Sequence, residues 1–377
     1  MDWNCKMMKV MTIFGTRPEA IKMCPLIKTL KRTKGVQCIV CLTGQHKEML
    51  DSVMETFHVV ADYNLQIMKS HQTLSEITCR VLSGLDKILE KEVPDIVLVH
   101  GDTTTSFAAA LACFYKGISV GHVEAGLRTY DMNAPFPEEF NRQAVDLISK
   151  IYFAPTRLAK QNLISEGKSK EQIFVTGNTV IDALQTTIED NYRCSDLDWC
   201  SDSRLLLVTA HRRENLGQPM EEMFKAIRSI VDHYPDVKVI YPVHKNEKVR
   251  EIANEILGNS ERIRLIEPLD VIDFHNYMKR AYIILTDSGG VQEEAPAFGI
   301  PVLVMRDTTE RTEGIEAGTL KLVGTSFESI YRETCKLLDA ADAYQRMSIA
   351  VNPYGDGHAS ERITEILLNQ VWNKKQG

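Results

Sequence analysis

The sequence predicts an α/β fold in which two Rossmann-like, doubly wound domains face each other across a cleft. Short apolar runs alternate with amphipathic segments almost throughout the chain, which is typical of βαβ units and parallel sheets. The length of 377 residues suits two domains that each bury their own core. The alternation stops once, in the polar stretch Asn191–Ser203, which we interpret as the domain connector. Ligands of such folds bind at the carboxyl ends of the strands.

The predicted elements follow the chain in order. The buried strands of the first half are predicted at Val10–Phe14, Val36–Leu42, Ile96–His100, Ser119–Val123, Ile151–Ala154 and Ile173–Thr176. The helices between them include His46–Phe57, Leu74–Glu90, Thr105–Tyr115 and Glu138–Ser149. The strands of the second half are predicted at Leu205–Thr209, Val237–Tyr241, Ile263–Leu265, Ile283–Thr286 and Val302–Met305. The chain ends in a predicted helix, Ala359–Trp372.

Composition excludes several classes of protein. Hydrophobic residues make up 44% and charged residues 25%, as in soluble globular proteins. The net charge of −7 argues against non-specific binding of nucleic acid. We see no uncharged apolar run of the roughly 20 residues that a membrane helix needs, and no signal peptide in the first ten residues. The sequence therefore predicts a cytoplasmic protein without nucleic-acid or membrane partners.

The cysteines and histidines do not indicate a metal site. Nine cysteines at irregular spacing fit free thiols in a reducing compartment. Cys38 and Cys41 form a CxxC, but they lie in a predicted strand and point to opposite faces. The ten histidines form no HxH or HExxH pair. We therefore expect no bound metal.

The first strand ends in a candidate anion site. Gly15 breaks the apolar run, and Thr16 and Glu19 have the spacing of a capping box at the start of a helix. Backbone N–H groups at a helix start bind anions, and Arg17 adds a planar cation. The segment is thus suited to a phosphate or a carboxylate. The alternative is an ordinary strand-to-helix turn with a surface arginine.

Carboxylate side chains occur at three further candidate positions, two at strand ends and one at a helix start. Asp102 and Glu124 each follow directly after a buried strand, and Glu138 opens a predicted helix that also carries Arg142. Asp102 has an alternative role as a helix cap, and Arg142 with Glu138 has one as a surface i,i+4 pair. A carboxylate at the end of a buried strand is costly unless it is partnered. Crowded carboxylates have different pKa values, which suits one to donate a proton and another to accept one.

The second half supplies cations. His211, Arg212 and Arg213 follow the strand Leu205–Thr209, and His244 follows the next strand. Histidine and arginine at strand ends indicate phosphate contacts.

A second candidate anion cradle follows the strand Ile283–Thr286. Gly289 and Gly290 at a helix start let the backbone approach a phosphate closely, and Ser288 can donate a hydrogen bond. Glu294, one turn further, can accept hydrogen bonds from a ribose diol. The sequence has no GxGxxG and no GxxxxGK[ST], so we expect a nucleotide diphosphate as ligand, and no cofactor.

These segments, in this order, resemble the non-hydrolysing UDP-N-acetylglucosamine 2-epimerases of bacteria over nearly the whole chain. The segments that carry the resemblance are FGTRPEAIK, HGDTTT, GHVEAGLRT, PFPEEFNR, TGNTVIDAL, TAHRREN, LTDSGGVQEEAP, RDTTERTEG and NPYGDGHASERI. The resemblance implies a GT-B-like fold and a homodimer. It also implies that the last helix crosses back to the first domain, which gives domains of residues 1–177 with 360–377 and of residues 178–359.

The resemblance further implies reversible conversion of UDP-GlcNAc to UDP-ManNAc, which supplies ManNAc for cell-surface polysaccharide. UDP is eliminated to give 2-acetamidoglucal and is then added back. The matching catalytic residues are Asp102, Glu124, Glu138 and His211. The matching substrate-binding residues are Arg17, Lys22, Arg142, Ser288, Gly289, Gly290 and Glu294.

Some members of this family bind a second UDP-GlcNAc as an activator. The matching positions are Gln45, His46, Glu138, Arg212 and His244. Two positions depart from the pattern, because Glu48 replaces a glutamine and His71 replaces an arginine. A neutral histidine does not substitute for an arginine beside a diphosphate, which weakens the case for activation.

Three other functions stay open at this point. A hydrolysing epimerase would release UDP and free ManNAc. A GT-B-type glycosyltransferase would need an acceptor site but no cluster of three carboxylates. A UDP-sugar sensor without activity would not need the acidic residues at all.

Overall fold

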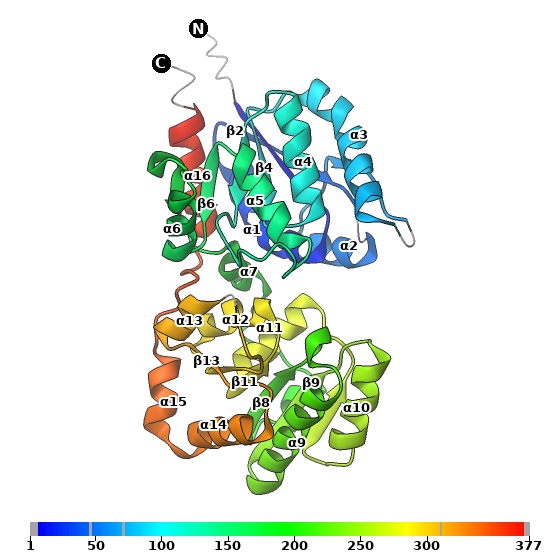
Figure 1. Cartoon of the computed structure of the whole chain (residues 1–377), viewed down its shortest axis with the longest axis vertical. Helices are drawn as coiled ribbons and strands as arrows, with labels where there is room; N and C mark the ends of the chain where they lie inside the picture. The colour runs from blue at the N-terminus through cyan, green and yellow to red at the C-terminus, as the bar shows by residue number, and fades with distance from the viewer. Residues whose placement is uncertain (1–6, 45–46, 70–71, 310, 373–377) are drawn as a thin grey trace. The chain divides into compact units, whose positions relative to one another are not determined.

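The computed structural model describes residues 7–44, 47–69, 72–309 and 311–372 (Figure 1). The chain divides into two compact units, which we call unit 1 (residues 1–186 and 354–377) and unit 2 (residues 187–353). Each unit is an α/β domain with one parallel sheet. The predicted fold class, two Rossmann-like domains of GT-B type, is confirmed.

Unit 1 contains a seven-stranded sheet with the order β3-β2-β1-β4-β5-β6-β7. Its strands are β1 (Met8–Phe14), β2 (Val36–Leu42), β3 (Tyr63–Asn64), β4 (Ile96–His100), β5 (Val120–Val123), β6 (Ile151–Ala154) and β7 (Ile173–Val175). The strand order reverses between β1 and β4. Loops that follow strands at such a switch point form the usual ligand site of this fold.

The helices of unit 1 are α1 (Arg17–Arg32), α2 (Lys47–Thr56), α3 (Leu74–Glu92), α4 (Thr104–Tyr115), α5 (Glu138–Ile148), α6 (Arg157–Ser165), α7 (Thr179–Thr187) and α16 (Ala359–Leu367). Helices α3, α4 and α5 share one buried core with β1 and β4. Helix α16, red in Figure 1, packs against α1 although most of the chain separates the two.

Unit 2 contains a six-stranded sheet with the order β10-β9-β8-β11-β12-β13. Its strands are β8 (Arg204–Thr209), β9 (Val237–Pro242), β10 (Ile263–Ile266), β11 (Ile283–Thr286), β12 (Val302–Val304) and β13 (Leu320–Leu322). Its helices are α8 (Ser195–Trp199), α9 (Gln218–His233), α10 (Glu247–Leu257), α11 (Val271–Arg280), α12 (Gly289–Glu294), α13 (Thr312–Ala317), α14 (Phe327–Asp339) and α15 (Ala341–Ser348). The order reverses between β8 and β11.

Alternate residues of β8 show why both faces of this sheet are covered. Leu206 and Val208 join the core formed with α9, α10 and α14. Leu205 and Leu207 join a second core formed with α8 and α11. Because both faces are covered, β8 is apolar from Leu205 to Val208, between Arg204 at its start and Thr209 at its end.

The stretch Asn191–Ser203, expected to be a connector, is part of unit 2. It contains α8 and places Leu197 and Cys200 in the second core, where each is 4% exposed. These two apolar side chains are enough to anchor an otherwise polar segment. The contacts divide the chain near residues 186 and 353, whereas the sequence suggested 177 and 359. Among the described residues, no helix is both long enough and apolar enough to span a bilayer.

Candidate active site

The capping box predicted at the start of α1 is present. Thr16 is the N-cap, and its side chain accepts from the backbone N–H of Glu19. The Glu19 carboxylate accepts in turn from the N–H groups of Gly15 (3.0 Å) and Thr16 (2.8 Å). These backbone donors are therefore occupied by the protein itself. The N–H groups of Gly15, Thr16 and Glu19 are thus not free for an anion, and the Arg17 side chain at this helix start is half-buried.

Glu19 also connects the ends of β1 and β4. Its second carboxylate oxygen accepts from Thr103 Oγ1 at 2.7 Å and lies 3.0 Å from Ser106 Oγ. Burial raises the pKa of Glu19, although these hydrogen bonds oppose the shift. The carboxylate therefore fixes two loops at the switch point of the sheet.

Asp102, directly after β4, forms an ion pair with Arg142 of α5. The distance from Arg142 Nη2 to Asp102 Oδ2 is 2.5 Å, and the Arg142 residue is 6% exposed. Asn141 Nδ2 donates to the backbone oxygen of Asp102. Thr103, and not Asp102, is the N-cap of α4, so the alternative role of Asp102 as a helix cap is wrong.

Glu124, directly after β5, has the partners that a buried carboxylate requires. Lys22 Nζ lies 2.5 Å from its Oε2, and Asn178 Nδ2 lies 2.7 Å from the same oxygen. The side chain is 8% exposed, and the backbone is left-handed with φ of 66°. A left-handed, non-glycine residue next to a strand end is typical of a functional site.

Glu138 begins α5 and is half-buried. Arg142 does not pair with it, because its guanidinium contacts Asp102 and Glu139 instead. Glu139 is fully buried and accepts from the N–H groups of Thr129 and Tyr130, both at 3.0 Å. Burial would raise the pKa of Glu139, but the hydrogen bond from Gln143, the two backbone hydrogen bonds and the charge of Arg142 together outweigh it, and the pKa is lowered. Glu139 therefore holds the loop before α5 in place.

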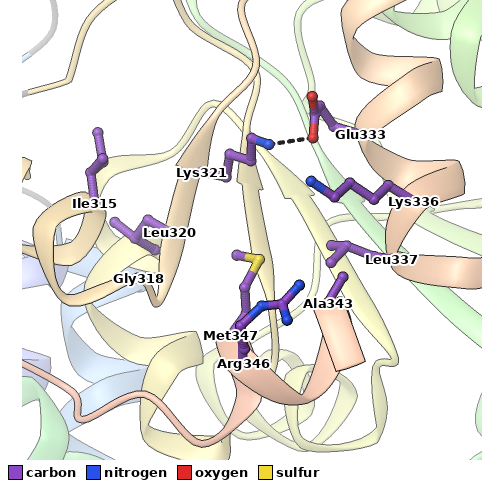
Figure 2. Close-up of a pocket in the computed structure, with 10 residues that line it drawn as sticks. All are labelled: Ile315, Gly318, Leu320, Lys321, Glu333, Lys336, Leu337, Ala343, Arg346 and Met347. Atoms are coloured by element: carbon purple, nitrogen blue, oxygen red, sulfur yellow. Dashed lines mark hydrogen bonds and ion pairs between the residues drawn. The ribbon is translucent and has the colours of Figure 1, made fainter. Parts of the chain in front are cut away.

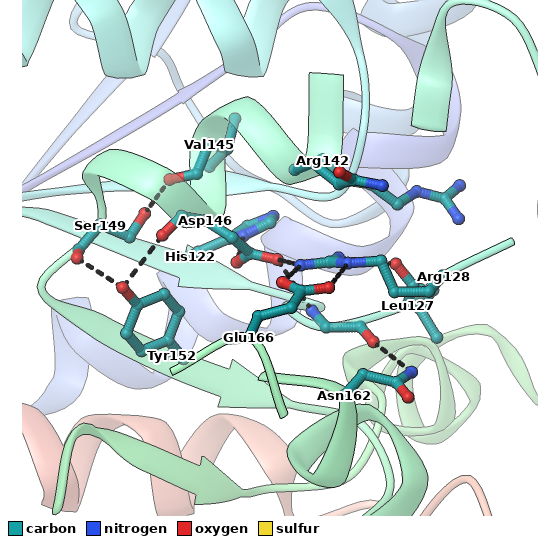
Figure 3. A network of polar contacts seen from close by, with 12 residues as sticks. His122, Leu127, Arg128, Arg142, Val145, Asp146, Ser149, Tyr152, Asn162 and Glu166 are labelled. Atoms are coloured by element: carbon teal, nitrogen blue, oxygen red, sulfur yellow. Dashed lines mark hydrogen bonds and ion pairs between the residues drawn. The ribbon is translucent and has the colours of Figure 1, made fainter. Parts of the chain in front are cut away.

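A network of polar contacts around the buried residues His122 and Asp146 links β5 to α5 (Figure 3). His122 Nδ1 lies 2.6 Å from Asp146 Oδ1, and Nε2 lies 2.8 Å from the oxygen of Gly101. Asp146 also pairs with Arg128, which in turn binds Glu166. Burial would raise the pKa of Asp146, but His122 and Arg128 lower it.

In unit 2, Asp287 organises the loop after β8. This fully buried carboxylate accepts from the N–H groups of His211 and Arg212, each 2.9 Å from Oδ2, and from Asn215 Nδ2 at 3.1 Å. Arg212 Nε also donates to the backbone oxygen of Asp287. The loop with the predicted phosphate-binding side chains is thus tied to the end of β11.

His211 and His244 lie side by side. Their rings stack with centroids 5.5 Å apart and planes 17° apart. Burial lowers the pKa of His211, and His244 and Arg212 act in the same direction against Asp287. His211 is therefore mostly neutral near pH 7 and can donate a hydrogen bond.

The glycine-rich turn after β11 starts helix α12 at Gly289, as the sequence predicted. Ser288 is the N-cap of α12, and its side chain makes no capping bond there. A Cβ at Gly289 would lie 3.0 Å from the guanidinium of Arg311, so a larger residue there would push that side chain slightly away. Arg311 pairs with Glu293 at 3.0 Å. Gly290 has more space, and Glu294 lies 3.6 Å from His275 Nε2.

The structure thus brings most of the predicted residues into two clusters, one in each unit. Sequence reasoning missed several of their partners, namely His100, Glu139, Asn178, Asp287 and Arg311. Asp287 follows β11 directly, so the rule that pointed to Asp102 could also have found it. The predicted activator residues Gln45 and His46 lie outside the described residues, as do His71 and the side chain of Glu48.

Two further observations concern ligand binding outside the predicted site. Among the described residues, no group of three or more His, Cys, Asp or Glu could hold a metal ion. A cavity of about 370 Å³ lies in unit 2 beside α14 and α15 (Figure 2), and none of the predicted site residues lines it.

Comparison with known proteins shows the family to which the chain belongs. The family profile described as UDP-N-acetylglucosamine 2-epimerase matches residues 28–368. The UDP-N-acetylglucosamine 2-epimerase of Bacillus subtilis is 58% identical over 371 residues, which are 98% of each chain. The crystal structure of the Neisseria meningitidis UDP-GlcNAc 2-epimerase bound to UDP-GlcNAc has a TM-score of 0.88 at 46% identity, over 96% of this chain and 100% of that one. The Methanocaldococcus jannaschii UDP-GlcNAc 2-epimerase, in complex with UDP-GlcNAc and UDP, has a TM-score of 0.79 at 36% identity with the same coverage.

Proposed function

Because the chain belongs to the UDP-N-acetylglucosamine 2-epimerase family, we propose that it converts UDP-GlcNAc to UDP-ManNAc reversibly by the non-hydrolysing route. In this route UDP is eliminated to leave 2-acetamidoglucal, and UDP is added back after the sugar has presented its other face. The product supplies ManNAc for cell-surface polysaccharide.

The observation that carries the proposal is a pair of strand-end carboxylates, each in an ion pair with a basic side chain that is buried (Arg142) or half-buried (Lys22). Asp102 pairs with Arg142 and Glu124 pairs with Lys22, both at 2.5 Å. The C2 hydrogen of the sugar has no adjacent carbonyl and leaves only as the C1–O bond breaks. The reaction therefore needs carboxylates that stabilise positive charge at the ring and exchange a proton with C2.

The remaining predicted residues fit the rest of the substrate. We assign the diphosphate to Arg17, His211, Ser288, Gly289 and Gly290, and the ribose to Glu294. A neutral His211 can donate a hydrogen bond to the departing phosphate, and the Arg17 side chain can balance its charge. Glu138 is the third catalytic carboxylate of the proposal.

Cell location and assembly follow from the same proposal. We expect the enzyme to act in the cytoplasm, where nucleotide sugars are made, and to form a homodimer. Activation by a second UDP-GlcNAc would involve Arg212 and His244. Kinetics with UDP-ManNAc as the sole substrate test this activation. A strict need for UDP-GlcNAc as activator would support it, and simple hyperbolic kinetics without UDP-GlcNAc would contradict it.

Proton exchange at C2 tests the proposed reaction. In heavy water, UDP-GlcNAc and UDP-ManNAc recovered at equilibrium should both carry deuterium at C2. The Asp102→Asn variant should lose most of this exchange and still bind UDP. Complete conversion to UDP and free ManNAc would select the hydrolysing route, and recovery of unlabelled UDP-GlcNAc would select a transferase or a sensor. Unchanged turnover in the Asp102→Asn variant would contradict the assignment of Asp102.

A further inference from the structure

His100, the last residue of β4, lies in the candidate site without an assigned role. It is 4% exposed, and Ser106 Oγ fixes its backbone by donating to its carbonyl oxygen at 2.6 Å. Within the described part of the chain, its Nε2 atom is buried and has no hydrogen-bond partner. A buried polar atom without a partner is costly, typically by about 1–3 kcal/mol. Such an atom indicates a partner that is present only in another state of the site.

The Nε2 atom faces Glu124. It lies 3.7 Å from Oε2, too far for a hydrogen bond but close enough that a small side-chain movement would make one. Lys22 and Asn178 donate to the same carboxylate oxygen. His100 is therefore the third nitrogen-bearing side chain directed at this group, and the one that has not formed its bond.

The charge state of His100 follows from its surroundings. Burial lowers its pKa to about 4, and the cations Lys22 and His122 act in the same direction against Glu124 and Asp102. The ring is therefore neutral near pH 7 and has one nitrogen with a lone pair. A lone pair on Nε2 repels an ionised carboxylate, but it accepts a hydrogen bond from a carboxylic acid. The long distance and the missing bond fit an ionised Glu124 beside an unprotonated Nε2.

We propose that His100 is a positioning residue whose Nε2 accepts a hydrogen bond from Glu124 once Glu124 has taken the proton from C2 of the substrate. This inference rests on the proposed function. The C2–H electron pair becomes the C1–C2 double bond of the glucal, the C1–O electrons leave with UDP, and the proton passes to the Glu124 carboxylate. The reverse steps return a proton and UDP. His100 gains its missing bond only while Glu124 carries the proton.

Two variants separate the hydrogen bond from the volume of the ring. His100→Met fills the space without an acceptor of comparable strength, whereas His100→Gln offers an amide oxygen in the same direction. His100→Met should reduce C2 exchange about tenfold near pH 7, and should move the acid limb of the exchange profile about one pH unit lower. The KM for UDP-GlcNAc should change less than the rate. His100→Gln should recover most of the loss, and His233→Met on the exposed face of α9 should match the parent enzyme.

Two results would overturn the inference. One is a His100→Met variant with the exchange rate and pH profile of the parent enzyme. The other is a His100→Gln variant as impaired as His100→Met although both bind UDP, because burial alone would then explain the effect. If His100→Met does not fold, nitrogen NMR of the parent enzyme, with the His100 signal identified by His100→Gln, decides the matter. A protonated Nε2 near pH 7 refutes the inference, and an unprotonated one supports it. An absence of C2 exchange in the parent enzyme would instead refute the proposed function.

Discussion

Replacing Asp287 by alanine should weaken UDP binding roughly a hundredfold. The carboxylate accepts hydrogen bonds from the backbone N–H groups of His211 and Arg212, and it does so from a fully buried position. A hydrogen bond to a charged group contributes about 1.5–3 kcal/mol. We take the lower value because His211 and Arg212 are partly exposed, so that water replaces some of the hydrogen bonding that the variant loses. The two backbone bonds then contribute about 3 kcal/mol to the order of the loop, and about 1.4 kcal/mol corresponds to a factor of ten in affinity.

Isothermal titration calorimetry with UDP measures this effect. Asp287→Asn keeps one oxygen for the two backbone donors and should lose only about tenfold in affinity, because a neutral acceptor makes a weaker bond than a charged one. Asp232→Ala is the matched control, since Asp232 is exposed and pairs with Arg228 on the same surface helix. If Asp287→Ala binds UDP within threefold of the parent protein, the loop does not depend on this carboxylate and the reasoning is wrong.

Two further predictions concern Arg142 and Asp356. Arg142→Lys should lower kcat in steady-state kinetics about 10- to 100-fold, because one ammonium group cannot reach Asp102 and Glu139 together as the guanidinium does. A variant with unchanged kcat would contradict the need for both contacts. A hydrogen bond from Arg362 lowers the pKa of Asp356 to about 2, which is below the pKa of this residue in the unfolded chain. The ionised Asp356 therefore stabilises the fold above about pH 4, and this stabilisation is lost as the pH falls toward 2. The free energies of unfolding in urea of the parent protein and of Asp356→Asn should therefore differ at pH 5 and converge at pH 2. An equal difference at both pH values would rule out the Asp356–Arg362 pair as the cause of the pH dependence.

The strands were the most predictable part of the fold. Those at Val36–Leu42, Ile96–His100 and Ile151–Ala154 have the predicted bounds, because each is an apolar run that ends at a polar residue or a turn. The strands β3 and β13 were missed. The first has only two residues, and the second carries a lysine in the middle of three, so neither has a recognisable hydrophobic pattern.

The candidate site was predictable where a residue directly follows a strand and unpredictable where a partner comes from far along the chain. Asp102 and Glu124 were found by their position alone. Asn178 lies 54 residues after the carboxylate that it binds, and Asp287 lies 76 residues after His211. No local pattern reports such a pairing, since it depends on which strands become neighbours in the sheet. The capping box of Thr16 and Glu19 shows a further case, in which a correctly predicted local pattern itself occupies the N–H groups of Gly15, Thr16 and Glu19 that an anion could otherwise use.

The packing of α16 against α1 has a consequence for how the protein is made. Unit 2 is a continuous segment, whereas unit 1 needs residues from both ends of the chain. During synthesis, every residue of unit 2 is added to the chain before the helix that completes unit 1. The part of unit 1 that is translated first therefore has to wait for α16, and the side of α1 that packs against α16 stays uncovered until that helix has formed.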